Sequence, residues 1–356
     1  MNRRHFIGTT GIATMAAQLR LASGAQSMAE LLASIITIKP NDPRIDYRGF
    51  ANLRVSSREA VGDRMIPDSP YRADNPAARI RFETNASEVS IVLNFVRMDS
   101  IPGRQHWQSE GMVSVEFSNQ VIIGRVKGSS GPQISKVIMG NTSRRAVEII
   151  LPYADVAIFL GLGLPKGAEL FDFKREALPR YVAYGDSITQ GFRAAHPVET
   201  YPFRLARAKK WDLTNMGFGS RKATIPDGSV LARLKPDVLT MMIGVNDCLQ
   251  RKPLERYAAD VAGMVTEFRR TQSKTPVFFI TPLPIAEPAK WKDSEKLDAY
   301  RAAATQALTR LGDTNLRIID GTTLMEPNPS LFADGLHPNA GGFEAIAKNL
   351  EQAISI

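Results

Sequence analysis

The sequence predicts two domains of different class, an antiparallel β-sandwich followed by an α/β domain with a parallel sheet. Three observations lead to this prediction. The chain has 356 residues, which is long enough for two separate hydrophobic cores. Between about residues 46 and 173, apolar residues recur at every second position, as in half-buried strands. From residue 180 onward, short apolar runs alternate with longer amphipathic segments, which is the pattern of strands alternating with helices.

The first 25 residues are similar to a twin-arginine export signal rather than to a part of either domain. Arg3 and Arg4 precede an apolar stretch that is too short to span a bilayer, and small residues suited to signal peptidase follow up to Ala25. We therefore expect a periplasmic or extracellular protein without a stable membrane anchor. The alternative is a basic amphipathic N-terminus that stays attached. Residues 26–45 are expected to form a linker.

Charge and composition argue against several classes of function. The formal net charge is +9, but no basic run is interleaved with aromatic residues, so no nucleic-acid partner is expected. Cys248 is the only cysteine, and the four histidines are widely scattered, which gives neither a disulfide nor metal-ligand spacing. The segment around Gly217 is not a dinucleotide fingerprint, because Lys222 stands where the third glycine should be. We expect no cofactor, and the sequence leaves the oligomeric state open.

The sandwich is predicted to cover residues 46–173. Polar turns separate many short alternating runs, a pattern typical of an antiparallel sandwich or jelly roll. The runs lie at 80–82, 89–95, 113–117, 121–126, 137–139, 147–151 and 156–160. The boundary with the second domain is expected between residues 172 and 179.

The α/β domain is predicted to cover residues 180–356. Its strands are expected at 181–184, 213–216, 238–243, 277–280 and 316–319, and its helices at 254–271, 297–311 and 343–354. The first of these helices carries a clear apolar face, formed by Tyr257, Val261, Met264, Val265 and Phe268. Strand and helix in regular alternation indicate a parallel sheet that is covered on both faces.

Four loops follow predicted strands and should meet at one edge of this sheet. Ligands bind at the carboxyl ends of the strands in such sheets, and the loops contain Ser187, Gly219-Ser220, Asn246 and His337. Each has a simpler interpretation on its own: a helix cap, a glycine turn, a polar turn and a surface histidine. Because the topology brings them together, their joint occurrence favours a reaction site.

The chemistry of acyl transfer requires these residue types. A serine hydroxyl becomes a nucleophile when a base lies within hydrogen-bond reach, and the imidazole of His337 suits that role. Asp334, three residues earlier, is placed to orient the imidazole and to stabilise its cation. A backbone amide and the Asn246 carboxamide can donate to the oxyanion of a tetrahedral intermediate.

The four segments resemble the conserved blocks of the SGNH (GDSL-like) hydrolases. They read Gly-Asp-Ser-Ile-Thr from 185, Asn-x-Gly-x-Gly from 215, Gly-x-Asn-Asp from 244 and Asp-x-x-His-Pro from 334. The resemblance covers residues 180–356 and implies a three-layer α/β/α fold. It also implies that Ser187 is the nucleophile, His337 the base, Asp334 its partner and Asn246 an oxyanion donor.

One block departs from the family pattern. The family has its oxyanion glycine as the sixth residue of the second block, where this chain has Ser220 after Gly219. Either residue can supply the backbone N–H, and glycine tolerates unusual backbone angles more readily. The first domain is similar in character to the jelly-roll domains that precede SGNH domains in some bacterial carbohydrate esterases. Trp107, Tyr153 and Tyr71 are candidates for stacking on sugars, with a core or rim position as the alternative.

The leading hypothesis is a secreted serine esterase that removes short acyl groups, such as acetyl, from a carbohydrate or another envelope polymer. One alternative keeps the site and changes the substrate, giving a lipase, lysophospholipase or thioesterase, or an enzyme that transfers the acyl group to a second alcohol. Another is a carbohydrate-binding protein with an inactive hydrolase domain, which the complete set of Ser187, His337 and Asp334 argues against.

Overall fold

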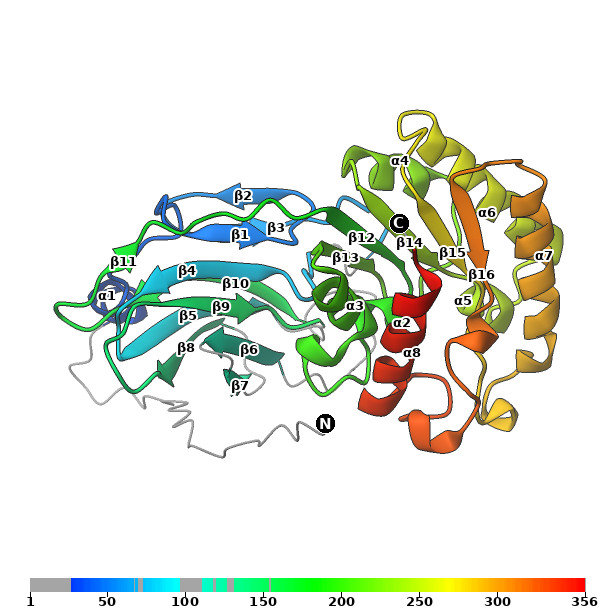
Figure 1. Cartoon of the computed structure of the whole chain (residues 1–356). Coiled ribbons are helices and arrows are strands. Elements are labelled where there is room, and N and C mark those ends of the chain that lie inside the picture. The colour runs from blue at the N-terminus through cyan, green and yellow to red at the C-terminus, as the bar shows by residue number, and fades with distance from the viewer. Residues whose placement is uncertain are drawn as a thin grey trace.

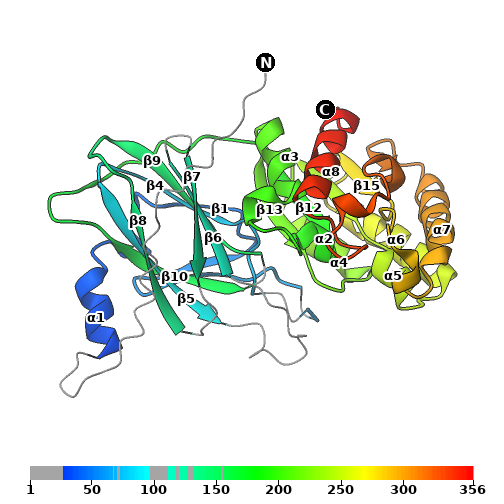
Figure 2. The same ribbon diagram turned by 90° about the horizontal axis from the view of Figure 1, so that it is seen from below.

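The computed structural model describes residues 27–66, 68–69, 73–96, 111–117, 120–126, 131–153 and 155–355. The predicted export signal and the candidate sugar-stacking residues Trp107 and Tyr71 lie outside this part of the chain. The described residues form an antiparallel β-sandwich and an α/β domain that lie side by side (Figures 1 and 2). The predicted fold class is confirmed.

The sandwich consists of two antiparallel sheets that enclose one apolar core. The first sheet has the order β1 (Asp46–Arg48), β4 (Arg79–Thr84), β9 (Arg145–Ile150), β6 (Gly111–Phe117), β7 (Gln120–Val126), with β11 (Leu170–Phe171) beside β4. The second has the order β2 (Leu53–Val55), β3 (Ala60–Gly62), β10 (Val156–Gly163), β5 (Glu88–Val96), β8 (Gly131–Ile138). The predicted alternation fills the core, because Ile80 and Phe82 meet Val89, Ile91 and Leu93 between the sheets.

Residues 26–45 were expected to form a linker, but this segment contains a helix and a β-bridge to the sandwich instead. Helix α1 (Met28–Ile35) begins at a capping box in which the side chains of Ser27 and Glu30 accept each other's backbone N–H groups. Ile38 then forms a bridge with Leu162 of β10. The linker prediction overlooked the Ser-x-x-Glu pattern, and the segment belongs to the sandwich. In both views α1 lies at the end away from the α/β domain (Figures 1 and 2).

The second domain has a five-stranded parallel sheet with helices on both faces. The strand order is β13 (Asp212–Gly217), β12 (Arg180–Gly185), β14 (Val238–Met242), β15 (Val277–Ile280), β16 (Leu316–Ile319). One face packs on α3 (Tyr201–Lys209) and α8 (Ala340–Ala353), and the other on α4 (Pro226–Arg233), α6 (Leu254–Arg269) and α7 (Leu297–Thr309). The chain order reverses beside β12, and a crevice at such a switch point is the usual ligand site.

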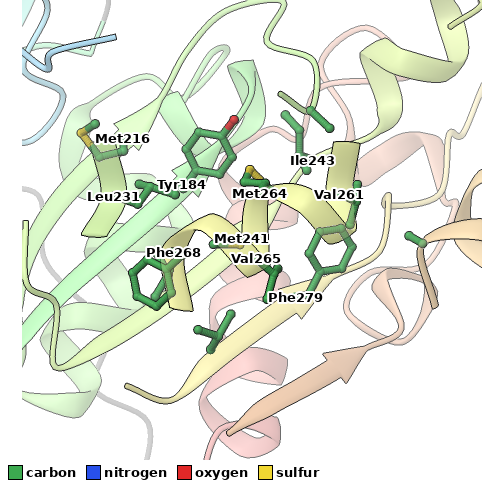
Figure 3. Close-up of a cluster of buried hydrophobic side chains, with 14 of the residues drawn as sticks. Tyr184, Met216, Leu231, Met241, Ile243, Val261, Met264, Val265, Phe268 and Phe279 are labelled. Carbon is green, nitrogen blue, oxygen red and sulfur yellow. The ribbon is translucent and has the colours of Figure 1, made fainter. Parts of the chain in front are cut away.

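The apolar face predicted for α6 forms the centre of the larger core. All five of its predicted residues are fully buried. Figure 3 shows Val261, Met264, Val265 and Phe268 of this face in a cluster with Tyr184 of β12 and Phe279 of β15. The sequence prediction overlooked α3 and α4, which are short and begin at or next to a proline.

The two domains share buried contacts. Ile66, from the loop after β3, is fully buried in the core of the α/β domain. Asp212, at the start of β13, pairs with Arg48 and Arg79 of the sandwich. Residues 172–179 connect the domains without forming a helix and with no strand of their own. No helix in the described part of the chain is long and apolar enough to cross a membrane.

Candidate active site

Ser187 lies at the first position of a short helix directly after strand β12. Strand β12 ends at Gly185, and Asp186 caps α2 (Ser187–Gln190) by accepting the N–H of Ile188 at 2.9 Å. The turn is tight because β13 runs close to it. A side chain at Gly217 would place its Cβ 2.0 Å from the backbone nitrogen of Gln190, so only glycine fits there.

Ser187, His337 and Asp334 form a continuous chain of hydrogen bonds. The Ser187 Oγ lies 3.0 Å from His337 Nε2, and His337 Nδ1 lies 2.9 Å from Asp334 Oδ2. The loop fixes the carboxylate from behind, since Asp334 Oδ1 accepts the backbone N–H groups of Leu336 and His337 at 3.1 and 2.8 Å. The structure therefore brings Ser187 together with His337, which lies 150 positions later in the sequence, and with Asp334 beside it.

The electrostatics of this chain favour an ionised Asp334. Partial burial raises the pKa of its carboxyl group, but the hydrogen bond and charge of His337 and the two backbone amides outweigh burial and hold the pKa well below its usual value. An ionised acceptor on Nδ1 keeps the proton on that nitrogen. Nε2 is then free to accept the proton of the Ser187 hydroxyl.

Three residues around His337 were not anticipated from the sequence. Phe192 packs edge-on against the imidazole at 4.7 Å between ring centroids, and Trp291 does so at 6.2 Å. Arg193 donates from Nε to Asp334 Oδ2 at 3.2 Å, and its side chain is half exposed at the rim. Phe192 and Arg193 directly follow the Gly-Asp-Ser-Ile-Thr-Gln-Gly run in the sequence. This position next to the Ser187 motif is the signal from which they could have been predicted.

A proline-containing segment, residues 281–291, forms a fixed wall beside the histidine loop. The backbone N–H of Ala286 donates to the carbonyl of Gly335 at 2.9 Å. Arg301 of α7 donates to the carbonyls of Pro282 and Leu283 at 2.7 and 2.8 Å. These contacts hold the wall in place from two sides.

Asn246 has a side-chain donor without a hydrogen-bond partner among the described atoms. It lies in the first turn of α5 (Val245–Leu249), which follows β14 after Gly244 in a left-handed conformation. Its carboxamide Nδ2 is buried and has no hydrogen-bond partner among the described atoms. A buried donor without a partner is costly, so an acceptor supplied by a substrate would satisfy it.

The neighbouring Asp247 has a structural role. Its fully buried carboxylate accepts the backbone N–H of Ala223 and pairs with Lys252 at 3.1 Å. Burial raises the pKa of Asp247, although Lys252 and that backbone donor oppose the shift. The second residue of the Asn-Asp pair thus holds the loop that follows β13.

The second oxyanion donor lies in the loop where the chain departs from the family pattern. Ser220 has a φ of +59°, and Gly219 is not among the residues with positive φ. Ser220, rather than the glycine before it, therefore adopts the left-handed angle. In the described part of the chain, neither N–H has an intramolecular acceptor. Both Gly219 and Ser220 stay candidates for the donor.

Asn215 and Gln190 hold the serine turn in place. The Asn215 side chain donates to the carbonyl of Thr189 at 2.8 Å and accepts the N–H of Gly217 at 2.8 Å. Gln190 donates to Asp74 and to the carbonyl of Tyr153, both in the sandwich, at 3.3 and 3.0 Å. The second block therefore begins with a positioning residue, and Tyr153 lies at the domain boundary.

A small apolar pocket lies beside the hydrogen-bonded chain. Its lining residues come from segments next to Ser187, Asn246 and His337 and from the wall, and they are Asp186, Ile188, Met242, Ile243, Val245, Pro282, Leu283, Pro284 and Leu336. In the described part of the chain, no group of three or more His, Cys, Asp or Glu side chains is arranged to hold a metal ion.

Comparison with known proteins identifies the second domain. Residues 183–345 match the GDSL-like Lipase/Acylhydrolase family. This match lies within the C-terminal domain and covers most of it. The chain is accordingly an ester-bond hydrolase. No curated protein sequence matches the chain.

Solved structures share both domains of this hydrolase. A salicylyl-acyltransferase from a tetracycline biosynthetic pathway is similar with a TM-score of 0.75 and 23% identity, over 89% of this chain and 96% of that one. A putative GDSL-like lipase from Bacteroides ovatus gives 0.71 and 20%, over 87% and 97%. A family two carbohydrate esterase from Clostridium thermocellum, in complex with cellohexaose, gives 0.65 and 14%, over 87% and 98%. At these identities the similarity establishes the shared two-domain fold.

Proposed function

We propose that this chain is an exported serine esterase that removes short acyl groups, in particular O-acetyl, from a carbohydrate or another envelope polymer. The observation that carries the proposal is the chain of hydrogen bonds from Asp334 through His337 to Ser187, with distances of 2.9 and 3.0 Å. Nucleophile, base and orienting acid stand in the relation that nucleophilic acyl transfer requires.

The first half-reaction uses these three residues in order. His337 Nε2 takes the hydroxyl proton as Ser187 Oγ forms a bond to the ester carbonyl carbon. The carbonyl oxygen becomes an oxyanion, and Asp334 stabilises the imidazolium through Nδ1–H. The tetrahedral intermediate then collapses: the bond to the alcohol oxygen breaks, and His337 gives that oxygen the proton. The acyl group remains on Ser187.

The oxyanion is stabilised by donors that have no other partner. The Nδ2 of Asn246 is buried and unpaired among the described atoms. The backbone N–H of Gly219 or Ser220 also has no acceptor there and can donate to the same oxyanion. Such donors act without reorganisation in a partly dry site, and losing one typically costs about 10²–10³ in turnover.

The second half-reaction repeats the chemistry with water. His337 takes a proton from water as its oxygen attacks the acyl-enzyme, and then returns a proton to Ser187 Oγ as the carboxylic acid leaves. These steps require no metal and no organic cofactor. The substrate is an ester of the acyl group with an alcohol. The alcohol part belongs to a small molecule or to a polysaccharide.

The wall beside the histidine loop favours a short acyl group. The segment from residue 281 to 291 is held by Arg301 and by the carbonyl of Gly335. A long acyl chain would require that wall to move. This argues against the lipase, lysophospholipase and thioesterase alternatives.

The carbohydrate part of the proposal and the export route rest on similarity. The carbohydrate esterase from Clostridium thermocellum shares both domains, and its complex contains cellohexaose. Arg3 and Arg4 and the apolar stretch after them support twin-arginine export to the periplasm or beyond.

Acyl transfer to a second alcohol is the other candidate, favoured by the similarity to a salicylyl-acyltransferase. It uses the same acyl-enzyme and replaces water by an alcohol in the second half-reaction. Adding a soluble alcohol such as a mono- or disaccharide to the assay separates the two. A transferase forms a new ester faster than free acid, whereas an esterase releases acid at an unchanged rate.

A panel of esters and a covalent probe test the proposal. We expect acetyl p-nitrophenyl ester to be cleaved faster than butyryl and long-chain esters, and acetylated polysaccharides to release acetate. A fluorophosphonate should label the protein, and Ser187→Ala should abolish labelling. Ser187→Ala and His337→Ala should each lose about 10³-fold or more in turnover, with little further loss in the double variant. A preference for long chains, or equal labelling of Ser187→Ala, contradicts the proposal.

A further inference from the structure

Arg64 of the sandwich domain reaches under the loop that carries the second oxyanion donor. Its side chain is 1% exposed and lies in the segment between β3 and Ile66, which is itself buried in the α/β core. Nη1 donates to the carbonyl of Gly217, the last residue of β13, and lies 3.5 Å from the carbonyl of Asn215. The guanidinium carbon lies 3.8 Å from the ring centroid of Phe218.

These contacts fix the peptide units that lead into the oxyanion loop. The carbonyl of Gly217 and the N–H of Phe218 belong to one peptide group, whose N–H donates to the carbonyl of Gly185 at 3.0 Å. The guanidinium holds one side of that planar group, and β12 holds the other. A charged donor to a buried carbonyl is about twice as strong as a neutral one, and stacking on Phe218 sets the side chain that precedes Gly219.

We propose that Arg64 is a positioning residue of the reaction, through which the sandwich domain sets the geometry of the Gly219-Ser220 oxyanion loop. This inference rests on the proposed function, because it assumes that the loop donates to an oxyanion. It gives the sandwich a role in turnover that is separate from any binding of carbohydrate.

The chain provides a matched control in a second buried arginine. Arg79, from β4 of the sandwich, is 6% exposed and also crosses to β13. It donates to the carbonyl of Leu213 at 3.0 Å and pairs with Asp212, both at the opposite end of the strand. Arg64 and Arg79 therefore join the same two domains through the same strand, and only Arg64 touches the end near the site.

Arg64→Met and Arg79→Met should separate positioning from stability. We expect both variants to unfold at a lower temperature. Only Arg64→Met should lower the kcat for p-nitrophenyl acetate, by about 10–100-fold, with KM within about threefold, because a displaced donor costs less than a deleted one. Its affinity for phenylboronic acid, which mimics the tetrahedral adduct on Ser187, should fall by a similar factor. Arg64→Lys keeps the positive charge but not the planar group that stacks on Phe218, so its kcat should lie between those of Arg64→Met and wild type. This variant replaces Arg64→Met in the test if Arg64→Met does not fold.

Hydrogen exchange supplies a readout that needs no activity. The backbone N–H groups of Gly217, Phe218 and Arg221, which donate to oxygens of the protein, should exchange faster in Arg64→Met or Arg64→Lys than in wild type, and at the wild-type rate in Arg79→Met. If wild type cleaves no ester and Ser187 is not labelled, the proposed function fails while exchange still decides whether Arg64 positions the loop. Unchanged exchange in this loop, or equal kcat losses in the two Met variants, overturns the role of Arg64.

Discussion

Asp186 precedes Ser187 directly, yet its carboxyl group caps helix α2. It accepts the N–H of Ile188 and lines the apolar pocket, while Asp334 is the carboxylate that contacts His337. The two acids also differ in their electrostatics. Burial raises the pKa of Asp186 to about 7, whereas His337 and backbone amides lower that of Asp334. Neighbouring carboxyl groups thus serve different roles because their surroundings differ.

The raised pKa of Asp186 predicts a fall in stability with increasing pH. The folded protein keeps the proton up to about pH 7, while the unfolded chain releases it near pH 4. Between these values the folded state binds more protons, so its stability falls as pH rises. Asp186→Asn keeps a capping oxygen and has no proton to lose. From pH 5 to pH 8, we expect the melting temperature of wild type to fall several degrees more than that of the variant.

The comparison is made on the difference between the two melting curves. Glu116 also has a raised pKa because of burial, and it contributes equally to both proteins. Asp186→Ala removes the cap as well, which costs about 1 kcal/mol at every pH. If wild type and Asp186→Asn change in parallel from pH 5 to pH 8, the carboxyl group is not protonated in the folded protein.

At the scale of elements, the site depends on how closely β13 approaches α2. Gly217→Ala would bring a Cβ to 2.0 Å from the nitrogen of Gln190 and 2.5 Å from the carbonyl carbon of Thr189. Both atoms belong to backbone, so the helix that begins at Ser187 must shift. We expect a loss of stability of about 2–3 kcal/mol and at least tenfold slower labelling by a fluorophosphonate. Thermal unfolding and labelling rates measure the two effects.

Gly341→Ala is the matched control for this change. Gly341 lies in the first turn of α8, where a Cβ would meet its nearest neighbour at 3.4 Å. Alanine favours the helix over glycine by up to about 1 kcal/mol, so this variant should be as stable as wild type or slightly more so. Equal behaviour of the two variants would mean that the close approach at Gly217 is unimportant.

The sequence alone was sufficient to predict the helices and strands with a strong apolar periodicity and the candidate site residues that belong to motifs. The five strands of the parallel sheet and helices α6, α7 and α8 lie within about three residues of their predicted bounds. The short strands β1, β2, β3 and β11 were overlooked, because two or three residues are too few to establish a period. Each is defined by its pairing with a neighbouring strand.

The candidate site divides in the same way. Ser187, Asn246, Asp334 and His337 belong to motifs and were predicted together, whereas Arg64 was not. Its partners are backbone carbonyls about 150 positions away, and any residue type can supply a carbonyl. No spacing or composition marks such a contact, so it requires the three-dimensional fold.

At the scale of the molecule, the sandwich and the α/β domain form one unit around β13. Ile66 and Arg64 contact the region near its carboxyl end, and Arg48 and Arg79 contact its amino end. Figure 1 shows β12 and β13 on the side of the sheet that faces the sandwich. The strands next to the domain boundary are thus also the strands that end at the serine turn and the oxyanion loop. Changes at the boundary should reach the site through them.

Asp212 is the acidic residue that joins the two domains at the amino end of β13. Its carboxylate pairs with Arg48 at 2.9 Å and with Arg79, whose side chains are 16% and 8% exposed. Asp212→Ala removes the carboxylate that both guanidinium groups share, and leaves them with Asp46, Glu148 and backbone carbonyls. Breaking a buried pair on one side typically costs about 3–5 kcal/mol. We expect a loss of about 3 kcal/mol and a calorimetric transition that broadens or splits into two.

Asp237→Ala tests whether the loss of stability in Asp212→Ala arises because the ion pairs of Asp212 are buried. Asp237 pairs with Arg180 at 3.2 Å near the start of β12, where both side chains are about half exposed. An exposed pair contributes only about 0–1 kcal/mol, so this variant should melt within about two degrees of wild type in a single transition. A single, equally small shift in Asp212→Ala would mean that Asp212 does not couple the domains. The buried contacts of Ile66 and Arg64 would then be the ones that hold them together.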